Sequence, residues 1–340
     1  MTPLEAARKW VDRDFLVVPV PHQQKHPVLP VWQELRLTRE DLPQYFDSKC
    51  QNLGILLGDQ LGTADVDCDC AEAIAAAVEL APPTGMSFGR ESKKTSHHIY
   101  RCQPPVRSRK FLDPINKSTI VELRCQKKDG SIGLQTVVPP SVHPTGEKIR
   151  FEPGRNRLPG QVEASTLETA VSRIAAASLL ARHWTKEGSR HYAFLALAGI
   201  LVRAGWNLDE AVNFHRAIYR ALWGISADFS ACEAEVKSTF TKHALDEEIT
   251  GFKSLAELVD KVALAAALEW LEIQSYLPTP KRAEWTEVAP FVTRHITPLT
   301  PQMFPGFLGE MVSAVASATE TPFELSGMLG LRRCLCLHRW

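Results

Sequence analysis

Residues 53–70, LGILLGDQLGTADVDCDC, contain two apolar runs, and the second run ends in alternating aspartates. Both runs, LGILLG and TADVDCD, have the composition of β-strands. Side chains at positions i, i+2 and i+4 of a strand point to the same face, so Asp65, Asp67 and Asp69 should lie together. The apolar neighbours, including Val66, predict a position near the core of a sheet rather than at its rim.

The bulk composition is that of an ordinary globular protein. The chain has 340 residues, enough for two domains and part of a third, with 44% hydrophobic and 23% charged residues. Its 39 Lys and Arg balance 39 Asp and Glu, so it lacks the positive charge typical of a protein that coats nucleic acid. Neutrality still permits DNA binding, because a basic groove can lie beside an acidic site.

Cysteine usage and the amino-terminal segment bear on the compartment. The chain has eight cysteines, with no C-x-x-C pair and no zinc-ligand spacing. Residues 1–15 form an amphipathic helical pattern rather than a signal peptide. Apolar runs stay below the ~18 residues that a membrane span needs. We therefore expect a cytoplasmic protein without a membrane partner.

The pattern of apolar residues changes along the chain, so residues 1–160 and residues 161–273 predict different kinds of domain. The first region contains further strand-like runs and two helical patterns, one of them with Thr38 as its N-cap, which predicts an α+β or α/β sheet domain. The second region repeats apolar residues near i, i+3, i+4 and i+7, which predicts an all-α helical domain. The strand-like runs are 15–20, 53–58, 63–69, 96–101, 119–124 and 134–139, and the helical runs are 37–47, 70–80, 172–184, 191–206, 208–223, 232–245 and 254–271.

The carboxyl-terminal part is predicted to hold a linker and the beginning of another module. Residues 274–303 are Pro-rich and aperiodic, as linkers are. A helical pattern restarts at residue 304 and stops in RRCLCLHRW, which has no cap and no clear period. Residues 304–340 therefore resemble a truncated start of a downstream module.

The three aspartates are the first candidates for chemistry. Neighbouring members should be roughly 6.6 Å apart along a strand that rises ~3.3 Å per residue. Carboxylates with this spacing can bind one divalent ion or bridge two. Without a cation they would raise one another's pKa. A solvated edge strand or a helix N-terminus is the alternative interpretation of such an Asp run.

Residues 88–101, FGRESKKTSHHIYR, gather Arg90 and Lys93 around Ser96 and His97. Cationic side chains and an imidazole are suited to binding a triphosphate. His97 and His98 face opposite ways on a strand, so only one can line a site. A basic surface hairpin with a buried histidine is the alternative.

Glu122 lies in the otherwise apolar strand TIVELR, where a carboxylate is costly unless it is paired or bound to metal. Arg124 lies on the same face and could be its partner. Residues 135–146 end a strand in a turn where Ser141 and His143 could touch a sugar or phosphate, or serve only the turn. Lys25, in a loop before Trp32, could neutralise phosphate or be solvated.

Taken in order, these residues resemble the bifunctional DNA primase/polymerase (prim-pol) family of the archaeo-eukaryotic primase superfamily, found in plasmids, phages and other mobile elements. The resemblance covers about residues 5–152. The matching positions are Lys25-His26-Pro27, Trp32, Gly54 to Gly58, Asp67-Cys68-Asp69, Thr95-Ser96-His97, Glu122 and Pro139 through Gly146.

The resemblance implies a fold and a mechanism. It implies an RRM-like sheet with flanking helices, followed by a helical domain that helps to position the template. It also implies template-directed nucleotidyl transfer with two Mg²⁺ or Mn²⁺ ions, on a single-stranded DNA template with nucleoside triphosphates. The implied metal ligands are Asp67, Asp69 and Glu122, with Asp65 as an accessory, although the pair Asp65/Asp67 also fits the pattern.

Nucleotide contacts and partners are implied in the same way. His97 would contact the triphosphate, helped by Arg90, Lys93 and Arg124. Residues 304–331 resemble the first helix of a helicase-like module, and a helicase module or partner is implied, although no Walker A sequence follows. Three other interpretations stay open: a non-catalytic replication initiator, a metal-dependent nuclease and an inactive fragment.

Overall fold

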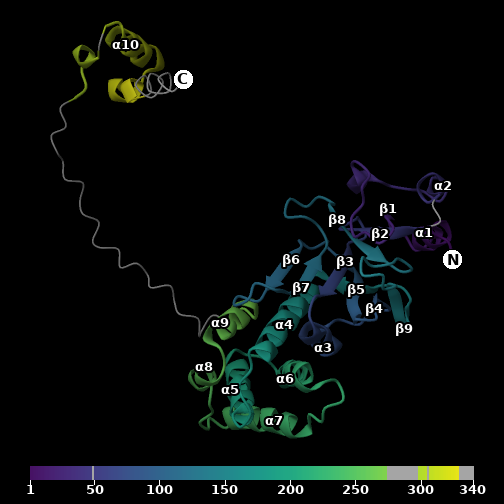
Figure 1. The fold of residues 1–340 in the computed structure, drawn as a ribbon. Coiled ribbons are helices and arrows are strands. Elements are labelled where there is room, and N and C mark those ends of the chain that lie inside the picture. Colours follow the sequence, from purple (N-terminus) through teal and green to yellow (C-terminus); the bar gives the residue numbers. More distant parts are fainter. Residues whose placement is uncertain (48–49, 274–297, 305, 329–340) are drawn as a thin grey trace. The chain divides into compact units, whose positions relative to one another are not determined.

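The computed structural model describes residues 1–47, 50–273, 298–304 and 306–328 (Figure 1). Residue contacts divide the chain into two units, residues 1–277 and 278–340. Most of the predicted linker, 274–303, and the unusual tail lie outside the described residues. Within the second unit, a 3-10 turn at Pro301–Met303 packs against helix α10 (Leu308–Thr319).

The first unit contains two sheets. The smaller sheet is antiparallel, in the order β1 (Val17–Pro21), β2 (Gln51–Leu57), β8 (Leu134–Val138). The larger sheet has seven strands, in the order β6 (Arg109–Leu112), β7 (Thr119–Arg124), β3 (Thr63–Cys68), β5 (Lys93–Gln103), β4 (Met86–Arg90), β9 (Arg150–Asn156), with β10 (Gly160–Glu163) paired in parallel to β5. All six predicted strands are present. The strands β4, β6, β9 and β10 were not predicted, because they are short or carry polar residues on exposed positions.

The amino-terminal helices differ in part from the sequence prediction. Helix α1 (Pro3–Val11) and helix α3 (Ala71–Leu80) form as expected. The helix predicted over 37–47 is reduced to α2 (Leu42–Tyr45). Thr38 does not cap it; instead its N–H and hydroxyl donate to the Asp41 carboxylate at 2.9 and 2.7 Å. That local turn satisfies the polar groups that a longer helix would have used.

The region after β10 is helical, as predicted. Its helices are α4 (Ala164–Arg182), α5 (Arg190–Arg203), α6 (Leu208–Trp223), α7 (Ser230–Ala244), α8 (Phe252–Leu258) and α9 (Lys261–Trp270). The single pattern at 254–271 forms two helices, because the Asp260 carboxylate accepts from the N–H groups of Val262 and Ala263 and begins α9. The prediction of a mixed α+β sheet region followed by a helical region is confirmed.

A tight turn between β2 and β3 fixes the position of β3 in the larger sheet. Gly62 has φ +67°, and a Cβ there would lie 1.8 Å from the carbonyl oxygen of Cys102. Only glycine permits this close approach, in which the Cys102 N–H donates to the Gly62 carbonyl at 2.8 Å. Within this turn, the Thr63 N–H also donates to the Asp59 carboxylate at 2.7 Å. This turn therefore sets the register of β3 against β5.

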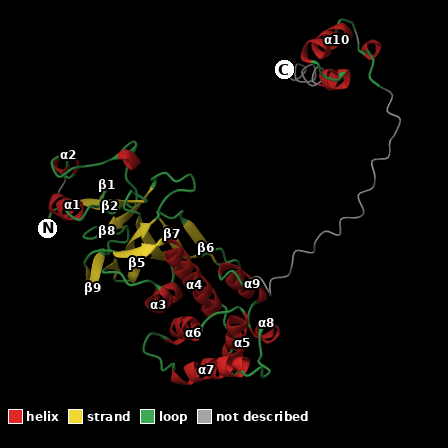
Figure 2. Cartoon of the chain, turned by 180° about the vertical axis from the view of Figure 1, so that it is seen from behind, coloured by secondary structure: helices red, strands yellow, loops and turns green. Residues whose placement is uncertain are grey.

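The two faces of β3 differ in character. Ala64, Val66 and Cys68 are buried in a core shared with the helices, whereas Asp65 and Asp67 point to the opposite face. Helices α3 and α4 cover the apolar face of the sheet, and the strands lie between α1 and the helical region in both views (Figures 1 and 2). The smaller sheet and its loops border a pocket on the charged face.

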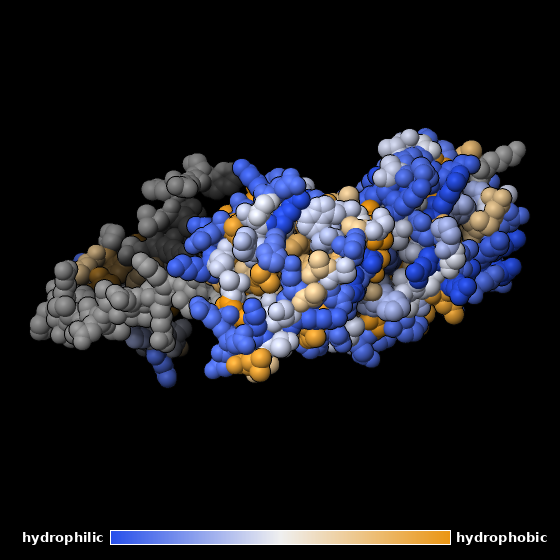
Figure 3. All heavy atoms as spheres, turned by 90° about the horizontal axis from the view of Figure 1, so that it is seen from below, coloured by the Kyte–Doolittle hydropathy of each residue, from blue (hydrophilic) through white to orange (hydrophobic). Residues whose placement is uncertain are grey.

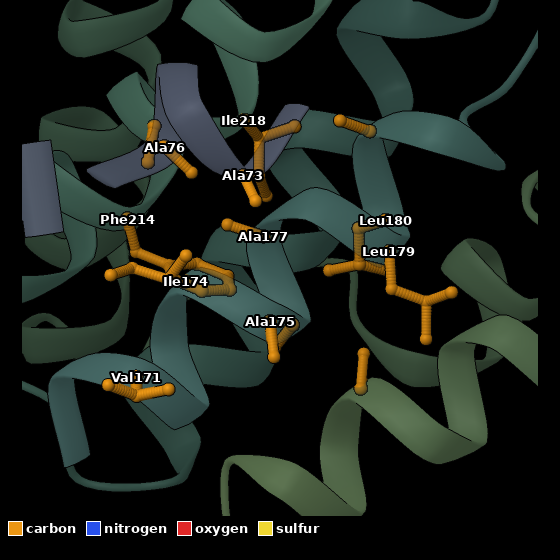
Figure 4. Packing of buried hydrophobic residues seen from close by; sticks show 14 of the residues in the cluster. Ala73, Ala76, Val171, Ile174, Ala175, Ala177, Leu179, Leu180, Phe214 and Ile218 are labelled. Carbon is orange, nitrogen blue, oxygen red and sulfur yellow. The ribbon is translucent and has the colours of Figure 1, made fainter. Parts of the chain in front are cut away.

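The apolar core continues from the sheet into the helical region. Ala73 and Ala76 of α3 lie close to Ala177 of α4 and Ile218 of α6 (Figure 4). Small side chains let these helices approach closely, since no bulky group separates their backbones. The proposed boundary at residue 160/161 therefore lies inside one packed unit, and it remains a prediction about domain organisation.

One face of the molecule is mainly hydrophilic, with hydrophobic residues scattered over it (Figure 3). Scattered exposed apolar side chains are usual on protein surfaces. Among the described residues, none of the helices has the length and apolarity to cross a bilayer.

Arg182, at the end of α4, joins the helical region to the sheet. Its guanidinium donates to both carboxylate oxygens of Glu72 on α3, at 2.9 and 3.1 Å. It also reaches the buried Asp113 at 3.3 Å and the Ser118 hydroxyl at 2.9 Å, both between β6 and β7. Burial alone would raise the pKa of Asp113, but hydrogen bonds from His183, the backbone and Arg182 hold it below its ordinary value.

We expect Arg182→Met to lower the free energy of unfolding by roughly 3 kcal/mol, because it leaves the Glu72 and Asp113 carboxylates without their shared cation. Urea denaturation followed by circular dichroism measures this change. The matched control is Lys237→Met, which removes an exposed pair with Glu233 on α7 and should cost less than about 0.5 kcal/mol. Equal losses in the two variants would contradict the proposed junction.

Candidate active site

Three neighbouring strands bring the predicted acidic and imidazole groups into one row. Asp67 on β3 is directly opposite His97 on β5 and Glu122 on β7. Residues opposite each other in a sheet share a face, so these side chains point the same way. Asp65, two residues earlier, is opposite Arg124. The prediction that Asp65, Asp67 and Asp69 share one face of a strand is confirmed for Asp65 and Asp67, whereas Asp69 lies just beyond the end of β3.

Asp65 is fully buried behind this row and holds His97 in place. Its carboxylate lies 3.1 Å from His97 Nδ1 and 3.4 Å from Arg124 Nη1. Burial alone would raise the pKa of Asp65, but the charges of His97 and Arg124 and a hydrogen bond from His97 keep it below its ordinary value. Asp65 is therefore an ionised acceptor that orients the imidazole.

His97 lies between this carboxylate and the Phe88 ring. The two rings stack with centroids 4.9 Å apart and an interplanar angle of 20°. Burial would lower the pKa of His97, but Asp67 and Asp65 raise it above its ordinary value. The charged imidazolium is therefore favoured in an otherwise enclosed position. His98, as predicted, faces the other way and does not line the pocket described below.

Asp67 carries an oxygen suited to binding a cation. Its Oδ1 is buried and has no hydrogen-bond partner, while His97 Nδ1 and Lys93 Nζ remain 3.7 and 3.8 Å away. Burial raises the pKa of Asp67, and Asp65 and Asp69 add to this effect. A buried carboxylate oxygen without a partner is costly unless a cation or donor satisfies it.

The other predicted ligands are engaged by lysines. Asp69, just beyond β3, lies 2.9 Å from Lys93 Nζ, and Glu122 lies 2.5 Å from Lys110 Nζ on β6. Within the described ranges, no three His, Cys, Asp or Glu side chains stand close enough to hold an ion as they are placed. Binding by the full set would require Asp69 and Glu122 to exchange these lysines for the ion.

A pocket of about 250 Å³ opens in front of Asp67 and Asp69. It lies between the larger sheet, the strand β8, the 3-10 helix Trp32–Glu34 and the loop that carries Val142. Of the predicted phosphate-contacting residues, the pocket is lined by Lys25, Arg90, Lys93, Ser96, His97, Arg124 and His143. The structure therefore brings together cations from four separate parts of the chain.

Three predicted residues lie outside the lining. Asp65 is behind it and Glu122 is at the β6 side. The Ser141 hydroxyl accepts from the Leu53 N–H at 2.9 Å and donates to the Leu53 carbonyl at 3.3 Å. Ser141 thus joins the turn to β2. This agrees with the alternative in which Ser141 serves only the turn and does not touch a nucleotide.

Two buried amides, Asn52 and Gln135, position the loops around the pocket, and the sequence prediction did not include them among the site residues. Asn52 Nδ2 donates to the carbonyls of Gln24 and Val142, at 3.1 and 2.7 Å, and its Oδ1 accepts from the Val142 N–H at 2.9 Å. Gln135 Nε2 donates to the Lys25 carbonyl at 2.6 Å. A polar amide in an apolar strand was the available signal, since such a group must find partners.

His143 is held next to the cations of the pocket. Its Nδ1 lies 2.8 Å from the Thr145 hydroxyl. Burial, together with the charges of Arg90 and Lys25, lowers the pKa of His143 below its ordinary value. A neutral imidazole is therefore favoured here, in contrast to His97.

Comparison with known proteins agrees with this arrangement. Residues 7–165 match the family model described as bifunctional DNA primase/polymerase, N-terminal (Prim-Pol). No curated protein matches the chain. The matched region includes both sheets and every residue that lines the pocket. Residues 7–165 therefore form a domain of the bifunctional DNA primase/polymerase (Prim-Pol) family, as the ordered motifs predicted.

Proposed function

We propose that this chain catalyses template-directed nucleotidyl transfer in the pocket between the two sheets. The observation that carries the proposal is the juxtaposition of a buried carboxylate oxygen that lacks a hydrogen-bond partner, on Asp67, with seven cationic or polar groups that suit a triphosphate. The Prim-Pol family acts as DNA primase and polymerase, so a DNA template and nucleotides are its general substrates.

The cations of the pocket would bind the phosphates of the incoming nucleotide. Arg90 can contact phosphate oxygens in a bidentate manner, whereas Lys25 and Lys93 act as point charges. His97 is fixed by Asp65 and would donate from its other ring nitrogen. Lys93 now neutralises Asp69, and the same ammonium group could turn to a bound triphosphate.

Asp67 and Asp69, with Glu122 from β7, would hold two Mg²⁺ or Mn²⁺ ions. The buried oxygen of Asp67, which has no hydrogen-bond partner, and the all-oxygen donor set fit these hard cations. Such ions, when bound, lower the pKa of an attacking hydroxyl and neutralise charge on a leaving pyrophosphate. The full burial of Asp65 and its contacts with His97 and Arg124 favour Asp67/Asp69 as the ligand pair and give Asp65 a positioning role.

A non-catalytic replication initiator is the alternative. The close pairing of Asp69 with Lys93 and of Glu122 with Lys110 is what a site without metal would keep. Under either proposal the protein would serve replication of a plasmid, phage or integrated element, with a helicase as a candidate partner. The two functions differ in whether new phosphodiester bonds are formed.

The first experiment is primer extension on single-stranded DNA with labelled nucleotides and Mg²⁺ or Mn²⁺. Asp67→Ala and Asp69→Ala should each reduce the rate by more than about 100-fold, since they remove groups that hold the ions. Asp65→Asn should reduce it by roughly 10–100-fold, because it removes the carboxylate that positions His97 and Arg124 but no proposed metal ligand.

The order of these effects decides between the two possible ligand pairs. Full activity in Asp69→Ala with none in Asp65→Asn would assign the ions to Asp65 and Asp67. No product from the unaltered chain with either metal, despite measurable DNA binding, would support the initiator instead. Omitting the primer separates priming from extension.

Metal binding can be measured without catalysis. Mn²⁺ at about 100 times its dissociation constant should stabilise the folded chain by about 2.7 kcal/mol, because the ion binds only the folded state. Asp67→Asn should lose this stabilisation in a thermal-shift measurement. Asp209→Asn, an exposed aspartate on α6, is the matched control and should keep it. A full Mn²⁺ response in Asp67→Asn would contradict the assigned ligand.

Asn52→Ala tests whether the loops around the pocket need to be fixed. Losing buried hydrogen bonds of about 1–3 kcal/mol should loosen the segments that carry Lys25 and His143. We expect KM for the nucleotide to rise by roughly tenfold while kcat changes less than about threefold. A fall in kcat with unchanged KM would show that Asn52 supports the chemistry rather than the binding of substrate.

A further inference from the structure

We propose that a single-stranded DNA segment leaves the nucleotide pocket across β4 and β9 and places a base in an apolar hollow beside α1. This inference rests on the proposed function and names the surface on which its template strand lies. Three features of the described residues carry it: neighbouring hollows that share lining residues, cationic side chains without ion pairs, and two aromatic side chains that line the hollow beside α1.

The hollows form a continuous path. The nucleotide pocket shares Gly89 and Arg90 with a second hollow of about 690 Å³ along β4 and β9. The second hollow shares Arg150 and Phe151 with a third one, of about 250 Å³, beside α1. Ile149 borders both the first and the third. The shared residues therefore make the three hollows neighbours along one stretch of the surface.

The charges along the two outer hollows suit a polyanion. They are lined by six cationic residues, Lys9, Arg13, Arg90, Lys94, Lys148 and Arg150, and by three carboxylates, Glu91, Glu147 and Glu152. Each carboxylate already has a partner. Glu91 pairs with Lys94, Glu147 with Arg90 and the Ser92 hydroxyl, and Glu152 accepts from the Thr95 N–H.

The cations that remain are the ones available for phosphate. Lys9, Lys148 and Arg150 are exposed and form no ion pair within the part of the chain that the structure describes. Lys9, on α1, lines the hollow beside that helix, Lys148 precedes β9 and lines the hollow along β4 and β9, and Arg150 begins β9 and lines both. Backbone phosphates of one strand would meet these unpaired charges in succession.

The outermost hollow suits an unpaired base rather than a phosphate. Its lining is mainly apolar, from Ala6, Pro139, Pro140 and Ile149, with Trp10 and Phe151 stacked at 5.7 Å and 26°. Bases stack on aromatic side chains with little dependence on sequence. A duplex keeps its bases paired and could not fill this hollow, so the surface favours a single strand.

The test compares two triple variants of the full chain that change its net charge equally. One carries Lys9→Glu, Lys148→Glu and Arg150→Glu. The control carries Lys242→Glu, Lys253→Glu and Lys261→Glu, on exposed positions of α7, α8 and α9. Fluorescence anisotropy with a labelled oligothymidylate, at fixed Mg²⁺ and varied KCl, gives the affinity and its salt dependence for each.

We expect the first variant to bind at least about tenfold more weakly and to have a log–log salt slope shallower by about 2, since each lost contact with a single strand accounts for about 0.7. The control should keep the unaltered slope. An unlabelled duplex should compete several-fold less well than the single strand. Mn²⁺ stabilisation and nucleotide binding should be unchanged in both variants.

Other outcomes would overturn the inference. An unaltered slope in the first variant, an equal loss in the control, or a preference for duplex would each exclude this surface as the path of the strand. Unequal thermal stability would show a folding defect, and the milder Lys→Gln and Arg→Gln triple then replaces the first variant. Because the assay needs no catalysis, absence of nucleotidyl transfer would refute the proposed function alone.

Discussion

The register of β3 between β5 and β7 is the constraint on which the site depends. It sets Asp67 opposite both His97 and Glu122, and a shift by one residue would turn every side chain of β3 to the other face. Gly62 enforces this register, because no larger residue could approach Cys102 so closely. A backbone contact outside the pocket lining therefore helps to decide which carboxylates enter it.

The same strand explains how the sheet can be both a structural core and a polar site. Its apolar face is covered by α3 and α4, which join it to the helical region through one continuous core. Its acidic face is closed by groups of opposite charge and by the loops of the smaller sheet. Asp65 is fully buried on this face, and its carboxylate is paired with Arg124 and His97. The buried oxygen without a hydrogen-bond partner belongs to Asp67, at the pocket.

The two histidines of the pocket show how the surroundings of a side chain decide which of its protonation states is favoured. The carboxylates beside His97 raise its pKa and favour its charged form, whereas burial and the charges of Arg90 and Lys25 lower the pKa of His143 and favour its neutral form. A charged and a neutral imidazole in the lining of one pocket can contact different parts of a nucleotide. The neighbouring cations and the aromatic hollow extend the same surface chemistry beyond the pocket.

The sequence by itself determined the strand that carries the aspartates, the change from sheet to helices and the family, because alternating and helical periods and ordered motifs are local patterns. It also indicated most of the pocket lining, from Lys25 to His143. Only the tertiary structure decided that Asp65 lies behind the pocket, that Ser141 is bonded to β2, and that Asn52 holds two loops. The physical reason is that burial and hydrogen-bond partners come from residues distant in the chain, whereas a local pattern fixes only the direction in which a side chain points.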